Sequence, residues 1–218
     1  MSSIGTCTDN AGNSASNTQS GIKIDKTAPT LAPTVSPNPV LLGGTATASP
    51  NAADALSGIA SQSCAATDTA TVGSKTAACT ATDIAGNTTN AVANYRVVYN
   101  FAGFFQPVDN LPAVNVKNAG SSIPVKFSLS GNRGLNIFAA GYPASQQINC
   151  TGGAPIGGVI PTVTPGNSNL TYEAGSDRYN YVWKTDRAWE GTCRQLQVRF
   201  IDGNTYVANF QFRQARPL

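Results

Sequence analysis

Five cysteines are the residues of this 218-residue chain with the clearest covalent chemistry: Cys7, Cys64, Cys79, Cys150 and Cys193. None of them forms a Cys-x-x-Cys spacing, so the sequence predicts no metal site at these positions. Pairing within each half of the chain gives the disulfides Cys64–Cys79 and Cys150–Cys193 and leaves Cys7 unpaired. Disulfides form in oxidising compartments, so the pattern favours an extracellular protein. The alternative is five buried free thiols in a cytosolic protein.

Histidine is absent from the chain. Its absence excludes Ser-His-Asp and Cys-His nucleophilic sites and every His-ligated zinc or iron site. The remaining acid–base candidates are four carboxylates near one another in sequence: Glu173, Asp177, Asp186 and Glu190. Glycoside hydrolysis needs two acids about 5 Å or about 6.5–9.5 Å apart in a cleft. These four are interleaved with basic residues, as on a solvated surface, so we expect neither an enzyme nor a cofactor.

Two Asp–Asn pairs have side chains suited to calcium. Asp83 and Asn87 supply hard oxygen ligands of the kind that Ca²⁺ takes, and so do Asp9 and Asn13. Each pair has a single carboxylate, whereas Ca²⁺ takes about six to eight oxygens. We therefore prefer the interpretation that each Asp caps its own turn, with Asp83 and Asn87 as the alternative calcium ligands.

Aromatic residues near the C-terminus suggest a second kind of ligand site. Tyr179, Tyr181 and Trp183 recur at every second position, so they share one face of a strand. On an exposed face their flat rings would stack on sugars. In the preferred interpretation they fill the core, and Trp189, in a predicted turn, raises the same question.

The elements that position these residues fall into two halves of different composition. The chain contains 8 Phe, 2 Trp and 7 Tyr, and none of them precedes Tyr95. Residues 1–94 have an excess of Asp over Lys, whereas the following residues have an excess of Lys and Arg over acids. Such a break indicates a domain boundary, which we place at about Asn100. The net charge of +3 is too small to indicate a nucleic-acid partner, and no apolar run is long enough to span a membrane.

A repeated turn motif divides the first half. Asp-Asn-Ala-Gly-Asn at 9–13 recurs as Asp-Ile-Ala-Gly-Asn at 83–87, and a Cys-Thr segment precedes each copy. Gly and Asn accept positive φ and the Asp caps the turn, so each copy predicts a hairpin joining the last two strands of a sandwich. The strand after the turn is expected at 22–24 in the first copy and at 95–99 in the second. Since two strands do not make an independent domain, residues 1–27 are expected to belong to a truncated repeat or to pair with something else.

Two alternating patterns are predicted in the second half. Ile123, Val125, Phe127 and Leu129 share one strand face, which we expect to be core, and Lys126 lies on the other face. Near the C-terminus, a three-residue loop at 202–204 would pair Phe200 with Tyr206, Val198 with Ala208 and Leu196 with Phe210. We expect positive φ at Gly203 or Asn204.

The motifs of the first half resemble bacterial immunoglobulin-like repeats of the HYR type. The resemblance is carried by Cys-Thr-Asp-Asn-Ala-Gly-Asn at 7–13, Asp-Lys-Thr-Ala-Pro-Thr at 25–30, Asp-Ala-Leu-Ser-Gly-Ile at 54–59 and Cys-Thr-Ala-Thr-Asp-Ile-Ala-Gly-Asn at 79–87. The block from about 100 to 213, with Pro-Val-Lys-Phe at 124–127, resembles the PxKF-type domain that often closes such chains.

This resemblance implies an all-β fold of tandem immunoglobulin-like β-sandwiches. The expected domains are a C-terminal hairpin of a truncated repeat at 1–27, a small sandwich at 28–99 and a larger PxKF-type β-sandwich at 100–218. In function, it implies an accessory or surface module of a secreted bacterial protein.

The combined expectation is a non-catalytic, extracellular structural or adhesive module that acts as a spacer or presenting domain beside other domains of a longer surface protein. One alternative is a module that binds surface polysaccharide through the C-terminal aromatics. Another is a subunit that assembles by adding its N-terminal hairpin to a neighbouring copy. Residues 1–5 lack the basic region and apolar core of a signal peptide, so none is expected within this chain.

Overall fold

The structure is a computed structural model that describes residues 2–20, 24–166 and 169–213. Its regular elements are β-strands, joined by turns and by one short 3₁₀ helix, Arg187–Trp189, so the all-β fold predicted from the sequence is confirmed. Among the described residues, no helix has the length and apolar character needed to cross a membrane.

The chain forms two compact units, each assembled from separate segments. The N-terminal unit consists of Met1–Pro37, Ala46–Thr67 and Thr76–Tyr95. The C-terminal unit consists of Asn38–Thr45, Asp68–Lys75 and Arg96–Leu218. Two segments within the expected 28–99 sandwich therefore belong to the same unit as the aromatic residues that follow Tyr95.

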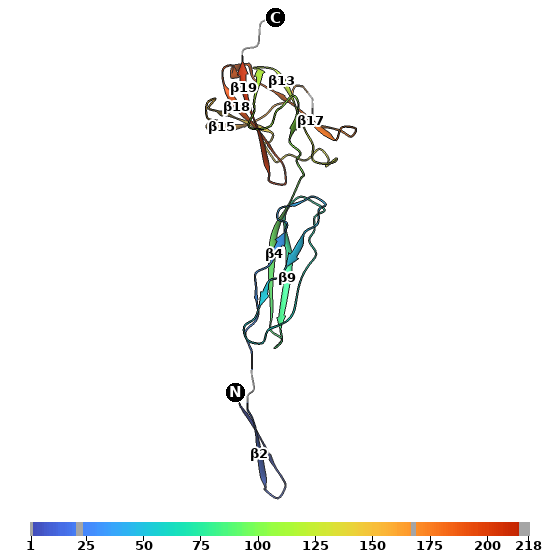
Figure 1. Cartoon of the computed structure of the whole chain (residues 1–218), viewed down its shortest axis with the longest axis vertical. Coiled ribbons are helices and arrows are strands. Elements are labelled where there is room, and N and C mark those ends of the chain that lie inside the picture. The colour runs from blue at the N-terminus through green and yellow to red at the C-terminus, as the bar shows by residue number, and fades with distance from the viewer. Residues whose placement is uncertain (1, 21–23, 167–168, 214–218) are drawn as a thin grey trace. The chain divides into compact units, whose positions relative to one another are not determined.

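A two-stranded hairpin lies at the start of the N-terminal unit. Strand β1 (Ser3–Thr8) pairs antiparallel with β2 (Ser14–Gln19), and every residue of both strands is exposed (Figure 1, dark blue). The strand after the first turn thus lies earlier in the chain than the expected 22–24. Of that expected strand, residues 22 and 23 lie outside the described residues.

Residues 28–98 form short strands around three longer ones. A four-stranded sheet has the order β5-β10-β9-β8, and two further pairs are β3 with β7 and β4 with β6. The bounds are β3 (Thr30–Leu31), β4 (Thr34–Ser36), β5 (Val40–Leu41), β6 (Thr47–Ser49), β7 (Ala52–Ala53), β8 (Ile59–Cys64), β9 (Gly73–Asp83) and β10 (Thr88–Val98).

Small side chains fill the core of the N-terminal unit. Strand β9 buries every second residue, among them Ala77, Cys79 and Ala81. From the neighbouring β10, Ala93 and Tyr95 are also buried. Burial scales with apolar area, so a core of this composition gains less from the hydrophobic effect than one built from large residues.

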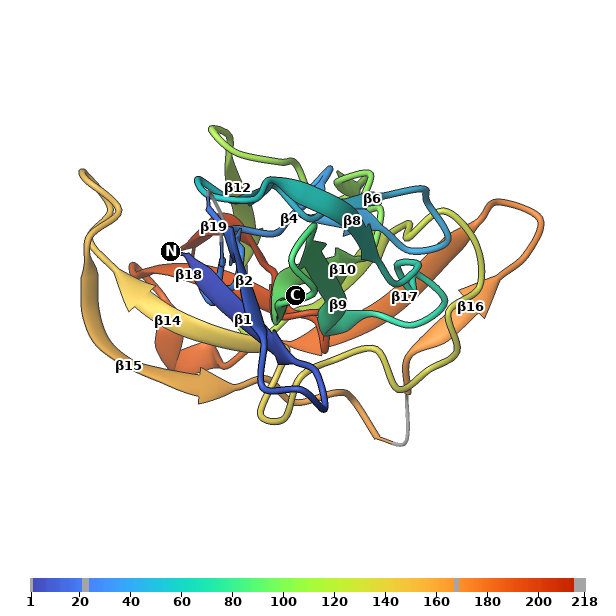
Figure 2. The ribbon, with the colours of Figure 1, turned by 90° about the horizontal axis from the view of Figure 1, so that it is seen from below.

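The C-terminal unit is a sandwich of two sheets. The four-stranded sheet has the order β11-β13-β17-β16, and the five-stranded sheet has the order β12-β19-β18-β14-β15, of which Figure 2 shows β14, β15 and β18 as neighbours. The bounds are β11 (Phe104–Phe105), β12 (Val114–Asn118), β13 (Ser122–Phe127), β14 (Ala144–Ile148), β15 (Pro155–Pro161), β16 (Thr171–Glu173), β17 (Arg178–Lys184), β18 (Cys193–Arg199) and β19 (Thr205–Arg213).

Alternation along the strands determines which residues fill this sandwich. Ile123, Val125, Phe127 and Leu129 are all buried, as the sequence pattern predicts. Facing side chains of β17, β18 and β19 complete one apolar core between the two sheets. The edge strand β15 differs, because each of its residues is exposed.

The C-terminal hairpin has the predicted faces but a different register. Val198 lies opposite Tyr206, and Leu196 lies opposite Ala208. The backbone N–H of Phe200 donates to the carbonyl of Asn204, so the three-residue loop is 201–203 rather than 202–204. The predicted pairing is therefore wrong by two residues, a shift that preserves which side chains face the core.

Candidate functional site

Both expected disulfides are present in the structure. Cys64 on β8 is bonded to Cys79 on β9, and Cys150 is bonded to Cys193 on β18. Cys7 on β1 is a free, exposed thiol. The first bond joins neighbouring strands inside the N-terminal unit, where the apolar side chains are small. The second attaches the turn after β14 to the central strand β18.

The aromatic stripe of β17 does not form an exposed platform. Tyr179 and Trp183 are fully buried, and Tyr181 is 7% exposed. All three belong to the core cluster between the sheets, and burial raises the pKa of the Tyr179 and Tyr181 phenols. The interpretation of these three residues as sugar-stacking ligands is therefore wrong, since their rings pack against Phe127, Phe138 and the residues of β19 instead.

Trp189 remains partly exposed, but its ring faces are occupied. The indole packs against Trp183 and Phe212, and the Arg194 guanidinium lies 4.1 Å from the ring centroid. Burial lowers the pKa of Arg194, which also donates to the Ser145 hydroxyl. Trp189 thus packs against the edge of the sandwich, and little of its ring face is free to stack on a ligand.

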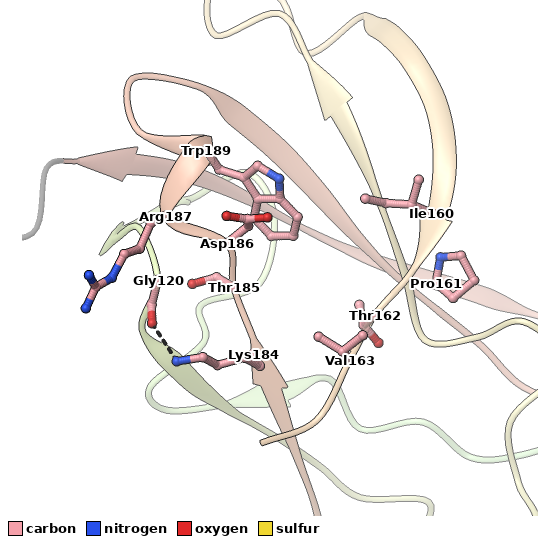
Figure 3. Close-up of a pocket in the computed structure, with 10 residues that line it drawn as sticks. All are labelled: Gly120, Ile160, Pro161, Thr162, Val163, Lys184, Thr185, Asp186, Arg187 and Trp189. Carbon is pink, nitrogen blue, oxygen red and sulfur yellow. Dashed lines mark hydrogen bonds between the residues drawn. The ribbon is translucent and has the colours of Figure 1, made fainter. Parts of the chain in front are cut away.

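A hollow of about 540 Å³ lies beside Trp189 (Figure 3). Lys184 Nζ donates to the Gly120 carbonyl at 2.8 Å, and Asp186 accepts from the backbone N–H of Ala188. The lining residues are Gly120, Ile160, Pro161, Thr162, Val163, Lys184, Thr185, Asp186, Arg187 and Trp189. An apolar wall with one amine, one guanidinium and one carboxylate is able to accept a small ligand that combines apolar and hydrogen-bonding groups.

Three of the four candidate acids in the C-terminal unit accept hydrogen bonds from neighbouring groups. Asp177 accepts from the Ser128 hydroxyl, and Glu173 accepts from the Ser176 hydroxyl. Asp186 caps the 3₁₀ helix. These contacts are those of carboxylates that hold turns.

The two copies of the turn motif share the hydrogen bonds that join the Asp carboxylate to the Asn. Asp9 Oδ1 accepts from the Asn13 N–H at 2.9 Å, and Asp83 Oδ1 accepts from the Asn87 N–H at 2.8 Å. In each copy the Asn amide also donates to the second oxygen of the same Asp, at 3.0 and 2.7 Å. The turn glycines have φ of 90° and 92°. The self-capped turn is therefore the geometry at both positions, and Asn87 presents its amide N–H, not its oxygen, to Asp83.

Asp83 is joined by two acids that the sequence argument did not single out. Asp25, Asp54 and Asp83 each offer a carboxylate oxygen, and these three oxygens all lie within 4.8 Å of one another. Asp54 accepts from the N–H groups of Leu56, Ser57 and Gly58. A signal was present in the sequence, because both new acids stand in short Asp-containing turn motifs like that of Asp83.

Comparison with known proteins adds no relative. No protein-family model matches the chain, and no curated protein matches it.

Proposed function

We propose that this chain is a non-catalytic, extracellular structural module of a bacterial secreted or surface protein, acting as a spacer or presenting domain. The observation that supports the proposal is the repetition of the capped hairpin turn at 9–13 and 83–87. Repeated turns of one kind are expected where similar β-modules follow one another in a chain. On this proposal the modules are of the HYR type and the aromatic unit is of the PxKF type.

The disulfides support the extracellular part of the proposal. Each of the two bonds joins two cysteines of the same unit. Such bonds persist in oxidising compartments and are reduced in most cytosols. A module with few large core residues gains stability from a covalent link of this kind.

Force spectroscopy on the full chain, tethered at its two ends, tests the load-bearing role. Cys64 and Cys79 are 15 residues apart and Cys150 and Cys193 are 43 apart, so oxidised loops stay closed under load. Reduction is expected to add about 50 Å and about 150 Å to the released lengths, at about 3.6 Å per residue. A chain that extends without discrete unfolding events in the oxidised state would contradict the role of a spacer.

The compartment is tested separately on protein taken from its native source. Intact mass without reductant, before and after thiol alkylation, is expected to show two disulfides and one alkylated residue, Cys7. Five alkylated thiols in freshly isolated protein would overturn the extracellular assignment.

Carbohydrate binding is a second candidate, and only the hollow beside Trp189 supports it now. Tryptophan fluorescence is expected to shift with a bound polysaccharide in the wild type and not in Trp189→Ala. Lack of any shift across a polysaccharide panel would exclude this candidate.

Assembly by strand addition is a third candidate, supported by the wholly exposed hairpin β1–β2. Light scattering is expected to give more than one copy per particle, and a single copy after deletion of residues 1–20. A monomeric full chain would contradict it.

A further inference from the structure

Three aspartates from distant segments converge in the N-terminal unit. Asp25 precedes β3, Asp54 follows β7, and Asp83 is the last residue of β9. One carboxylate oxygen from each lies within 4.8 Å of the other two. Because the three segments are far apart in sequence, the fold itself brings these charges together.

Backbone N–H groups orient each of the three carboxylates. Asp25 Oδ1 accepts from Thr27 N at 2.9 Å, Asp54 Oδ1 from Gly58 N at 2.7 Å, and Asp83 Oδ1 from Asn87 N at 2.8 Å. One oxygen of each group is thus held in place. The second oxygen of Asp83 accepts from the Asn87 amide at 2.7 Å, whereas the second oxygen of Asp25 accepts no hydrogen bond from the described residues. The geometry is preorganised, since its turns fix it without a ligand.

One of these second oxygens is buried without a partner. Asp25 Oδ2 is inaccessible to solvent and accepts no hydrogen bond from the described residues. Asp83, beside it in the cluster, is 1% exposed. Burying a carboxylate oxygen away from water without a hydrogen-bond donor costs free energy. We therefore expect a ligand from outside the protein at this oxygen.

The charges around the cluster point to a cation. Among the described residues the one ion pair is Lys75 with Asp68, so none of the described Lys or Arg side chains forms an ion pair with Asp25, Asp54 or Asp83. Like charges at this separation repel one another in a partly buried site unless a counter-ion lies between them.

We propose that Asp25, Asp54 and Asp83 bind one Ca²⁺ ion. Carboxylate oxygens are the hard ligands that Ca²⁺ takes, and its flexible coordination accepts ligands from three loops more readily than the strict octahedron of Mg²⁺. Backbone carbonyls and water would complete the shell. The carbonyls of Asp25 and Thr27 are near, because the Asn87 amide donates to both at 3.3 and 3.4 Å.

The role of Asn87 in this site differs from that expected from the sequence. Its amide nitrogen donates to Asp83 Oδ2 at 2.7 Å, so it positions the carboxylate and is not itself a ligand. The bound ion would join the segment that leads into β3 to the turns after β7 and β9. Calcium would therefore stabilise the N-terminal unit against unfolding.

The chain contains its own matched control. Asp9 and Asn13 form the same capped turn as Asp83 and Asn87, yet Asp9 belongs to no cluster of three acids among the described residues. A single capped turn and a three-carboxylate site are thus compared within one molecule.

The experiment is a calorimetric titration of the chelator-treated full chain with CaCl₂, together with thermal unfolding followed by circular dichroism with and without Ca²⁺. One ion per chain is expected to bind, with a Kd of roughly 0.1–1 mM, as for many extracellular modules. The Asp25→Asn and Asp54→Asn variants are expected to weaken binding at least about tenfold, the effect of removing one charged ligand from a site whose affinity follows its charge count. Asp9→Asn is expected to bind like the wild type.

Three results would overturn the proposal: no saturable heat and no Ca²⁺-dependent melting shift in the wild type, equal binding by Asp25→Asn, or an equal loss in Asp9→Asn. Asp25 lies outside the strands, so Asp25→Asn remains decisive if a variant at Asp83 fails to fold. MgCl₂ in place of CaCl₂ tests the choice of ion, and tighter binding of Mg²⁺ would overturn it. These outcomes are independent of the compartment and of the load-bearing role.

Discussion

The backbone N–H of Tyr99 donates to the Asp202 carboxylate at 2.8 Å, although the two residues are 103 positions apart in the sequence. Asp202 is 2% exposed, and its second oxygen accepts from the backbone N–H of Asn204 at 2.8 Å. Arg96 donates to the Asp202 carbonyl at 2.7 Å and to the Asn204 side chain at 2.9 Å. The loop of the last hairpin is thereby fastened to the first residues of the unit.

Replacing this carboxylate should destabilise the C-terminal unit. Asp202→Ala leaves the buried N–H of Tyr99 without an acceptor, which should cost about 2–3 kcal/mol of unfolding free energy. Urea unfolding followed by tryptophan fluorescence measures this, because both tryptophans are in the C-terminal unit. Glu190→Ala, at an exposed position, is the control and should change the free energy by less than about 0.5 kcal/mol. Equal losses in the two variants would contradict the role of Asp202.

The Cys64–Cys79 bond should stabilise the N-terminal unit selectively. Loss of a bond that closes a loop of about 15 residues should cost about 3 kcal/mol, so the Cys64→Ala/Cys79→Ala variant should unfold at lower urea. Circular dichroism should detect the lower urea midpoint, whereas the midpoint measured by tryptophan fluorescence should not change. Cys7→Ser is the matched control, since Cys7 has no disulfide partner. An equal shift of the urea midpoint in tryptophan fluorescence and in circular dichroism would contradict the prediction.

Asp177 should make the C-terminal unit sensitive to acid. Hydrogen bonds from the Ser128 and Tyr172 hydroxyls and the Gly131 N–H lower the pKa of Asp177 below its ordinary value. A lowered folded-state pKa contributes stability above the unfolded value, and that contribution is lost as the pH falls through the folded value. The loss should amount to about 1 kcal/mol or less between about pH 5 and pH 2, because the carboxylate is partly exposed to solvent.

Asn is the informative substitution at this position. Asp177 has φ of 51°, a left-handed conformation that Asn adopts more readily than other side chains. Asp177→Asn should be less stable than the wild type at pH 7 and should match it near pH 2. Parallel pH profiles for the two proteins, measured by urea unfolding, would refute the prediction.

The two turn glycines provide a paired test of the repeat. Gly86 has φ of 92° and Gly12 has φ of 90°, and an added Cβ would meet no atom within 4 Å at either position. Gly86→Ala should therefore cost about 1–2 kcal/mol through backbone strain alone. Gly12→Ala should leave the unfolding of both units unchanged, because its hairpin is wholly exposed. A comparable loss in both variants, measured by circular dichroism, would show that the hairpin contributes to a folded core.

Sequence reasoning succeeded where one local rule decides the outcome. Strand alternation identified Ile123, Val125 and Phe127 as core residues, and turn chemistry identified the capped turns at 9–13 and 83–87. Gly203 has positive φ, as the hairpin argument expects. In each case the backbone conformation or the parity of a strand is sufficient to fix the result.

Its failures share a cause, which is that a distant partner competes with the local rule. The last hairpin has a register two residues from the predicted one, and the loop residue Asp202 is buried because it accepts from Tyr99, more than a hundred residues earlier. Asp25 and Asp54 stand in short sequence motifs of their own, but only the fold brings them to Asp83. Strand alternation correctly placed Tyr179, Tyr181 and Trp183 on one face of β17. Whether that face is buried depends on the sheet that packs against it.

The exposed edge strand β15 has a consequence for how this molecule behaves at high concentration. An open strand edge is a template for further strands and so for aggregation. Strand β15 begins with Pro155 and ends with Pro161, and a Gly pair at 157–158 lies between them. Proline has no N–H to offer a partner, and glycine weakens pairing through its flexibility. The composition of this edge thus opposes the addition of a strand from another copy.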